Sequence, residues 1–122
     1  MSTARFRFPK SARLLRRAEY RRIYEEGSKF VGPVFAAFYL RAESKGPARV
    51  GYTTPKALGT SVVRNRIKRR LREAVRVALP SLEPGWQIVF NPKRAAHEAG
   101  FSRLTDEVER LWSVLRTRGT RS

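Results

Sequence analysis

The chain has 122 residues and carries 27 Lys and Arg against 10 Asp and Glu, which gives a formal net charge of +17 at pH 7. It contains no Cys and a single His, which excludes disulfides, thiolate metal sites and His-paired metal sites. It has no run of about 18 apolar residues that could span a membrane, and residues 1–10 lack the apolar middle of a signal peptide, so we expect a single cytoplasmic domain.

The first segment, residues 1–13, is basic and shows no clear periodicity. We expect it to be a flexible arm ahead of one folded domain over residues 14–119, with a short tail at residues 120–122. Helical spacing begins with Tyr20, Ile23 and Tyr24 at i, i+3 and i+4, which predicts a helix over residues 18–26. Gly27 stands where the C-terminal cap of that helix is expected.

Strands are predicted next. Residues 29–31 are compatible with a very short strand, and residues 34–41 are rich in aromatic and other β-forming residues. Alternation places Phe35, Ala37 and Tyr39 on one face of the longer strand and Phe38 on the other. Residues 49–54 form a further strand, and the short connection at residues 44–47 predicts an antiparallel hairpin between the two.

The strongest helical pattern covers residues 61–79, between a cap at Thr60 or Ser61 and the closing Pro80. Its apolar stripe consists of Val63, Ile67, Leu71, Ala74, Val75 and Ala78. A strand over residues 86–91 ends at Pro92, and a last helix over residues 102–118 ends at Gly119. The apolar stripe of this last helix consists of Leu104, Val108, Leu111 and Leu115. This order of elements predicts an α+β sandwich.

The helix over residues 61–79 is unusually basic, with seven positive charges and one negative charge among the thirteen residues 64–76. One row of cations at i, i+4 spacing consists of Arg64, Lys68, Arg72 and Arg76. Three further cations, Arg66, Arg69 and Arg70, broaden this row into a basic arc. The amide side chain of Asn65 lies inside the same arc. Like charges at this spacing destabilise a helix by about 0.2–0.5 kcal/mol per pair. A polyanion partner would relieve the repulsion, and the preference for Arg over Lys favours nucleic acid because Arg pairs with phosphate in a bidentate way.

Alternatives remain for each of these features. The basic face could be merely solvated, and Asn65 could act as a local cap instead of contacting a base or ribose. An anionic membrane surface could also attract the helix, but its apolar face lacks Trp and Phe and is needed for the core. Tyr20, Tyr24 and Phe38 could be either stacking platforms for single-stranded nucleic acid or ordinary core residues.

An active site of the chain's own is not expected. Asp106, Glu107 and Glu109 form the one acidic cluster, and we interpret them as solvated residues of the last helix and not as a metal site. His97 has no neighbour in the sequence that would tune it as a general base. The sequence therefore indicates a nucleic-acid-binding chain without a cofactor or catalytic residues.

One stretch is specific enough to suggest a family. Residues 56–73, with the core Arg64-Asn65-Arg66-Ile67-Lys68-Arg69, closely resemble the signature of the bacterial ribonuclease P protein subunit. Phe8-Pro9-Lys10, Arg13-Leu14, Tyr20 and Tyr24 match its N-terminal region, and the likeness covers nearly the whole chain. It implies a small mixed sheet in the order α-β-β-β-α-β-α, with the basic helix as a left-handed crossover between parallel strands.

The resemblance also implies a function. The family protein binds a catalytic RNA that cleaves the 5′ leader from precursor tRNA, with Mg²⁺ held through the RNA and no obligate protein partner. Carried over, the residues facing the catalytic RNA or nearby substrate are Arg64, Asn65, Arg66, Lys68, Arg69 and Arg72. The leader cleft would contain Tyr20, Tyr24 and Phe38, with Lys56 at its rim. Pro55 and Ala57 flank Lys56, where family members often carry two basic residues. The alternative is a ribosome-associated or RNA-chaperone protein with no role in cleavage.

Overall fold

The computed structural model describes residues 16–42 and 46–120. The predicted basic arm, its part of the family resemblance and most of the predicted tail lie outside these residues. The elements are α2 (Arg17–Glu26), β1 (Ser28–Val31), β2 (Phe35–Arg41), β3 (Arg49–Tyr52), α3 (Ser61–Ala78), β4 (Trp86–Pro92) and α4 (Phe101–Thr120). Short 3-10 turns occupy Lys56–Leu58, Leu79–Ser81 and Arg94–His97. The predicted order of elements is confirmed, although α4 continues through Gly119 instead of ending there.

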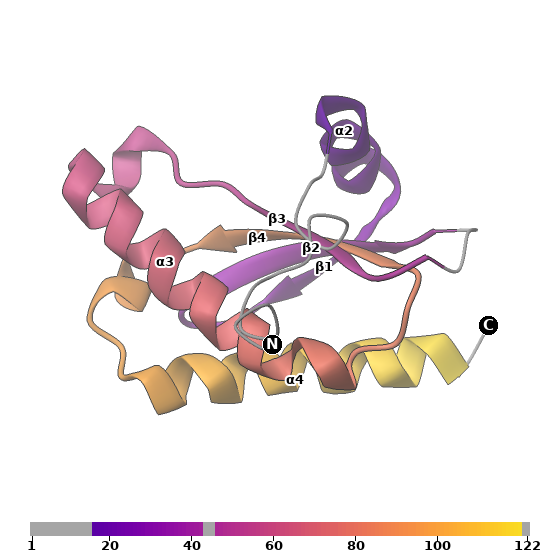
Figure 1. The fold of residues 1–122 in the computed structure, drawn as a ribbon. Helices are drawn as coiled ribbons and strands as arrows, with labels where there is room; N and C mark the ends of the chain where they lie inside the picture. Colours follow the sequence, from indigo (N-terminus) through magenta and orange to yellow (C-terminus); the bar gives the residue numbers. More distant parts are fainter. Residues whose placement is uncertain (1–15, 43–45, 121–122) are drawn as a thin grey trace, which may run out of the picture.

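The four strands form one mixed sheet in the order β1-β2-β4-β3. α3 and α4 cover one face of this sheet, and α2 lies against the opposite face (Figure 1). The α+β sandwich predicted from the sequence is therefore confirmed. α3 connects two strands, β3 and β4, that pair in parallel, as the resemblance implied.

The predicted hairpin between the second and third strands is wrong. β4 lies between them: it pairs antiparallel with β2, with Phe38 opposite Val89, and parallel with β3, with Val50 opposite Ile88. The physical reason is burial, since Ile88, Val89 and Phe90 are all fully buried and only a central strand is covered on both faces. The short connection brings β2 and β3 close in sequence but does not make them partners.

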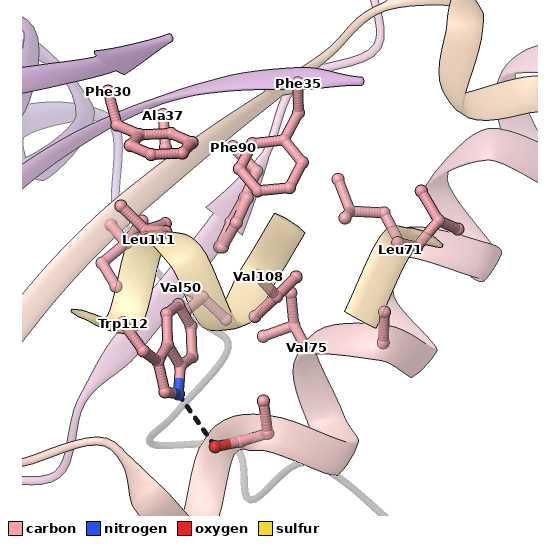
Figure 2. Close-up of a cluster of buried hydrophobic side chains, with 14 of the residues drawn as sticks. Phe30, Phe35, Ala37, Val50, Leu71, Val75, Phe90, Val108, Leu111 and Trp112 are labelled. Carbon is pink, nitrogen blue, oxygen red and sulfur yellow. Dashed lines mark hydrogen bonds between the residues drawn. The ribbon is translucent and has the colours of Figure 1, made fainter. Parts of the chain in front are cut away.

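The main core lies between the sheet and the helix pair α3 and α4. Phe35, Phe90 and Trp112 are among its largest fully buried side chains. Figure 2 shows the rings of Phe35 and Phe90, which come from the sheet, facing the apolar side chains of α3 and α4, and the indole of Trp112 projecting from α4 toward α3. The Trp112 indole N–H donates to the carbonyl of Ala78 at 2.8 Å, which ties α4 to the end of α3. Because α3 is anchored on this side, its basic side chains must point away from the core.

Candidate nucleic-acid interface

α2 is held on the open face of the sheet by one apolar anchor and one ion pair. Ile23 is fully buried beneath the helix, and Glu19 pairs with Arg49 of β3. Gly27 makes the tight exit from the helix possible, because a Cβ there would lie 2.5 Å from the carbonyl oxygen of Tyr39. These contacts fix the position of the aromatic side chains that α2 carries.

Two of the three predicted cleft aromatics are in direct contact. The rings of Tyr24 and Phe38 meet edge to face, with centroids 4.8 Å apart and planes at 71°. Tyr24 is 40% exposed, even though it lies in a helix packed against the sheet. The interpretation of Tyr24 as an ordinary core residue is therefore wrong, and its ring is open to a ligand.

Tyr20 lies deeper than Tyr24. Burial raises the pKa of its phenol, while the backbone N–H of Tyr52 acts in the opposite direction as a hydrogen-bond donor. Tyr20 is therefore less readily deprotonated than a solvent-exposed tyrosine. It forms the inner part of the aromatic surface, toward β3, and Tyr24 forms the outer part.

Three polar residues of this surface were not predicted from the sequence. The Tyr24 hydroxyl donates to Asn91 Oδ1 at 3.0 Å, and the Thr53 hydroxyl donates to the same oxygen at 2.6 Å. The ammonium of Lys29 lies 5.3 Å from the centre of the Phe38 ring. Asn91 was interpreted only as the end of a strand, and the register that places it beneath α2 depends on the unpredicted pairing of β4.

The basic face of α3 divides into an exposed line and a flank. Asn65, Arg66 and Arg69 are exposed on the side away from the core. Arg64, Lys68 and Arg72 are half-buried along one edge of the helix. The Thr60 side chain accepts a hydrogen bond from the backbone N–H of Val63 at 3.2 Å, so the helix begins with the predicted cap.

Arg72 of the basic flank and Tyr20 of α2 both act electrostatically on Tyr52 of β3. The positive charge of Arg72 acts to lower the pKa of the buried Tyr52 phenol, and the hydroxyl of Tyr20 acts to raise it. Burial is the larger effect and raises the pKa of Tyr52. Tyr52, whose ring stacks on Phe90 with centroids 5.6 Å apart, therefore stands at the β3 edge of the sheet, with Arg72 of the flank and Tyr20 of α2 in its neighbourhood.

Some cations of α3 are engaged within the protein. Arg70 donates from Nη1 to the carbonyl of His97 at 2.7 Å and from Nη2 to the carbonyl of Ala99, so it binds the turn that precedes α4. Arg76 pairs with Glu73, and this contact lowers the pKa of the Glu73 carboxyl. The prediction that Arg70 broadens the exposed basic face is therefore wrong, because the sequence cannot show backbone partners so far along the chain.

The remaining predicted residues can also be placed. Lys56 is exposed in the turn that precedes α3, near the N-terminal end of that helix. Glu107 is buried, not solvated as expected from the sequence, and pairs with Arg110 at 3.0 Å. Within residues 16–42 and 46–120, no group of three or more His, Cys, Asp or Glu side chains is arranged to hold a metal ion. The same residues include no helix long and apolar enough to cross a bilayer.

Comparison with known proteins identifies relatives over nearly the full length. The ribonuclease P family model matches residues 8–116. The ribonuclease P protein component of Symbiobacterium thermophilum is 37% identical over 103 residues, which cover 84% of this chain and 90% of that protein. The corresponding protein of Gluconacetobacter diazotrophicus is 37% identical over 111 residues, which cover 89% of this chain and 92% of that protein.

Solved structures share the fold. The RNase P protein of Staphylococcus aureus superposes with a TM-score of 0.73 and 24% identity, covering 87% of this chain and 96% of that one. The RNase P protein of Thermotoga maritima gives a TM-score of 0.72 and 22% identity, covering 82% of this chain and 94% of that one. The arrangement of one helix above a mixed sheet and two below is thus common to these proteins.

Proposed function

Because the chain belongs to the ribonuclease P protein family, and is thus a subunit of the enzyme that matures the 5′ end of tRNA, we propose that it binds two RNAs. The exposed line and flank of α3 bind the catalytic RNA. The cleft between α2 and the sheet holds the 5′ leader of precursor tRNA. Its relatives include bacterial proteins, and bacteria transcribe tRNA in the cytoplasm, so the chain acts there.

The observation that carries this proposal is the contact between Phe38 and the exposed Tyr24, with the ammonium of Lys29 beside the Phe38 ring. Aromatic faces beside a cationic groove bind single strands with little dependence on sequence, because every base has a π face. Tyr24 and Phe38 provide the faces, and Lys29 provides a positive charge beside the Phe38 ring. A leader that varies in sequence from one precursor to the next needs this kind of site.

The chain contributes binding and orientation to the reaction, and the RNA subunit contributes the chemistry. The described carboxylates do not form a metal site, and His97 is the only imidazole of the chain. Hydrolysis of a phosphodiester needs metal ions or a tuned acid and base. We therefore assign Mg²⁺ to the RNA. A role in the ribosome or as an RNA chaperone gains no support from the relatives.

The test compares precursor tRNA with mature tRNA in the holoenzyme reconstituted with ribonuclease P RNA. Tyr24→Ala should weaken precursor binding by about 1–3 kcal/mol, the value of one base–aromatic stack, and leave mature tRNA unaffected. Phe101→Ala is the matched control, because Phe101 is also an exposed aromatic, 43% exposed, but lies at the start of α4. A folded Tyr24→Ala protein that binds both tRNAs as before would show that the leader does not occupy this cleft.

A further inference from the structure

A hollow of about 540 Å³ opens between the turn Arg94–His97, the first turn of α4 and the loop that joins β1 to β2. α4 and α2 lie on opposite faces of the sheet (Figure 1), so this hollow is separate from the cleft between α2 and the sheet. Its volume is within the range of about 300–1,000 Å³ that is typical of sites for small ligands. The hollow is therefore large enough to hold one unit of a larger partner.

Three charged side chains line the hollow. Arg94 and Glu98 come from the turn and its C-terminal cap, Arg103 comes from α4, and all three are exposed. None of them forms a hydrogen bond or an ion pair with another residue of 16–42 and 46–120, although their charges are of opposite sign. The rest of the lining is small and largely apolar, and consists of Pro33, Val34, Ala95, Ala99 and Gly100. The hollow therefore presents both signs of charge beside an apolar wall.

Backbone contacts fix the walls of the hollow. The N–H of Lys93 donates to the carbonyl of Val34 at 2.9 Å, and the Lys93 ammonium donates to the carbonyl of Gly32 at 2.7 Å, so the turn is bound to the loop after β1. The same turn accepts a hydrogen bond at its His97 carbonyl from Arg70 of α3, which makes the hollow adjacent to the basic helix. An RNA bound along α3 can therefore reach the hollow without leaving the protein surface.

We propose that this hollow binds one ribonucleotide of the catalytic RNA, an inference that rests on the proposed function. Arg94 and Arg103 pair with the phosphate, since a guanidinium can donate to two phosphate oxygens at once. Glu98 accepts from the 2′-hydroxyl of the ribose, because an ionised carboxylate only accepts hydrogen bonds and repels a phosphate. Most of the lining residues are exposed, so a strand can enter and leave the hollow without a free end. The site thus distinguishes RNA from DNA.

The first test measures the binding of ribonuclease P RNA to the full-length protein over a range of salt concentrations. Arg103→Ala should flatten the log–log salt slope, and Arg94→Ala/Arg103→Ala should flatten it by about 0.7–0.9, the contribution of one phosphate. Both variants should unfold in urea as the wild type does, because both residues are exposed. Arg116→Ala is the matched control, since it removes an exposed cation of the same helix about 20 Å away, and it should leave the slope unchanged.

The second test maps the ribose contact. Ribonuclease P RNA that carries 2′-deoxynucleotides at random positions is separated into bound and unbound fractions, and the positions depleted from the bound fraction are identified. We expect one position at which the deoxy substitution weakens binding to the wild-type protein about three- to tenfold, the effect of one hydrogen bond, and has no effect on binding to Glu98→Ala. Glu109→Ala is the matched control, because Glu109 is an exposed acid of α4 outside the hollow, and it should retain the sensitivity.

A wild-type salt slope in both arginine variants would overturn the inference while the protein still binds the RNA. An unchanged set of sensitive positions with Glu98→Ala would do the same. If the wild-type protein failed to bind ribonuclease P RNA at all, the proposed function would be overturned, and the inference with it.

Discussion

Arg70 and Arg66 are neighbours on the same basic helix, yet the structure predicts opposite effects when each is replaced by alanine. Arg66 is exposed and forms no hydrogen bond or ion pair with the other described residues. Arg70 is half-buried and its guanidinium donates to the carbonyls of His97 and Ala99, with a longer contact of 3.4 Å to Ala96. We therefore expect Arg70 to stabilise the fold and Arg66 to bind RNA.

The magnitude for Arg70 follows from its bonds. A hydrogen bond to a charged group contributes about 1.5–3 kcal/mol. Arg70 makes two such bonds, to the carbonyls of His97 and Ala99, close to the buried side chain of Ala96. Water can replace part of this interaction because the site is only half-buried, so Arg70→Ala should lower the free energy of unfolding by about 2–4 kcal/mol. Arg70→Lys should recover part of the loss, since one ammonium cannot match the forked guanidinium.

Urea unfolding and the salt dependence of RNA binding separate the two roles. Arg66→Ala should change the free energy of unfolding by less than about 0.5 kcal/mol, as for most surface substitutions. It should flatten the log–log salt slope of binding by about 0.7–0.9, the contribution of one phosphate contact. Arg70→Ala should leave the slope unchanged. The reasoning is refuted if Arg70→Ala flattens the slope while its stability equals that of the wild type.

Three further predictions follow from contacts around the cleft. Tyr52→Phe should stabilise the protein by about 1 kcal/mol in urea unfolding, because it removes a buried hydroxyl that has no hydrogen-bond partner among residues 16–42 and 46–120. Burial raises the pKa of Tyr52 above its ordinary value of 10.0, so the free energy of unfolding should fall as pH rises above about 10. Tyr52→Phe should reduce that fall. An equal fall in both proteins would contradict the assignment of the raised pKa to Tyr52. Gly27→Ala should lower the free energy of unfolding by about 1–3 kcal/mol and weaken precursor tRNA binding, because the new Cβ would lie 2.6 and 2.5 Å from the backbone oxygens of Ile23 and Tyr39. An unchanged thermal unfolding temperature would show instead that α2 shifts to accommodate the methyl group.

The sequence predicts the helices well because their boundaries are local. α3 begins at the cap predicted from Thr60 and buries the predicted stripe from Ile67 to Ala78. The strand partners depend on the rest of the fold, and the short loop after β2 suggested a pairing of β2 with β3 that does not form. A better signal was present in the uninterrupted apolar run Ile88, Val89 and Phe90, which is typical of a central strand.

The candidate site was predictable where residue type alone suggests the chemistry. The basic face of α3 and the pair Tyr24 and Phe38 were identified, and the structure places the two rings in contact. Asn91 was missed because its role depends on Tyr24 and Thr53, which approach it from other elements. Arg70 was placed on the wrong surface for the same reason, since its partners lie more than twenty residues further along the chain.

Cleavage of precursor tRNA at limiting Mg²⁺ tests most directly whether the chain binds and orients RNA without performing the chemistry. Three reactions are compared: ribonuclease P RNA alone, the protein alone, and the two combined. We predict slow cleavage by the RNA alone, none by the protein alone, and strong stimulation when both are present. Cleavage by the protein alone, or no stimulation of the RNA by the folded protein, would contradict the account.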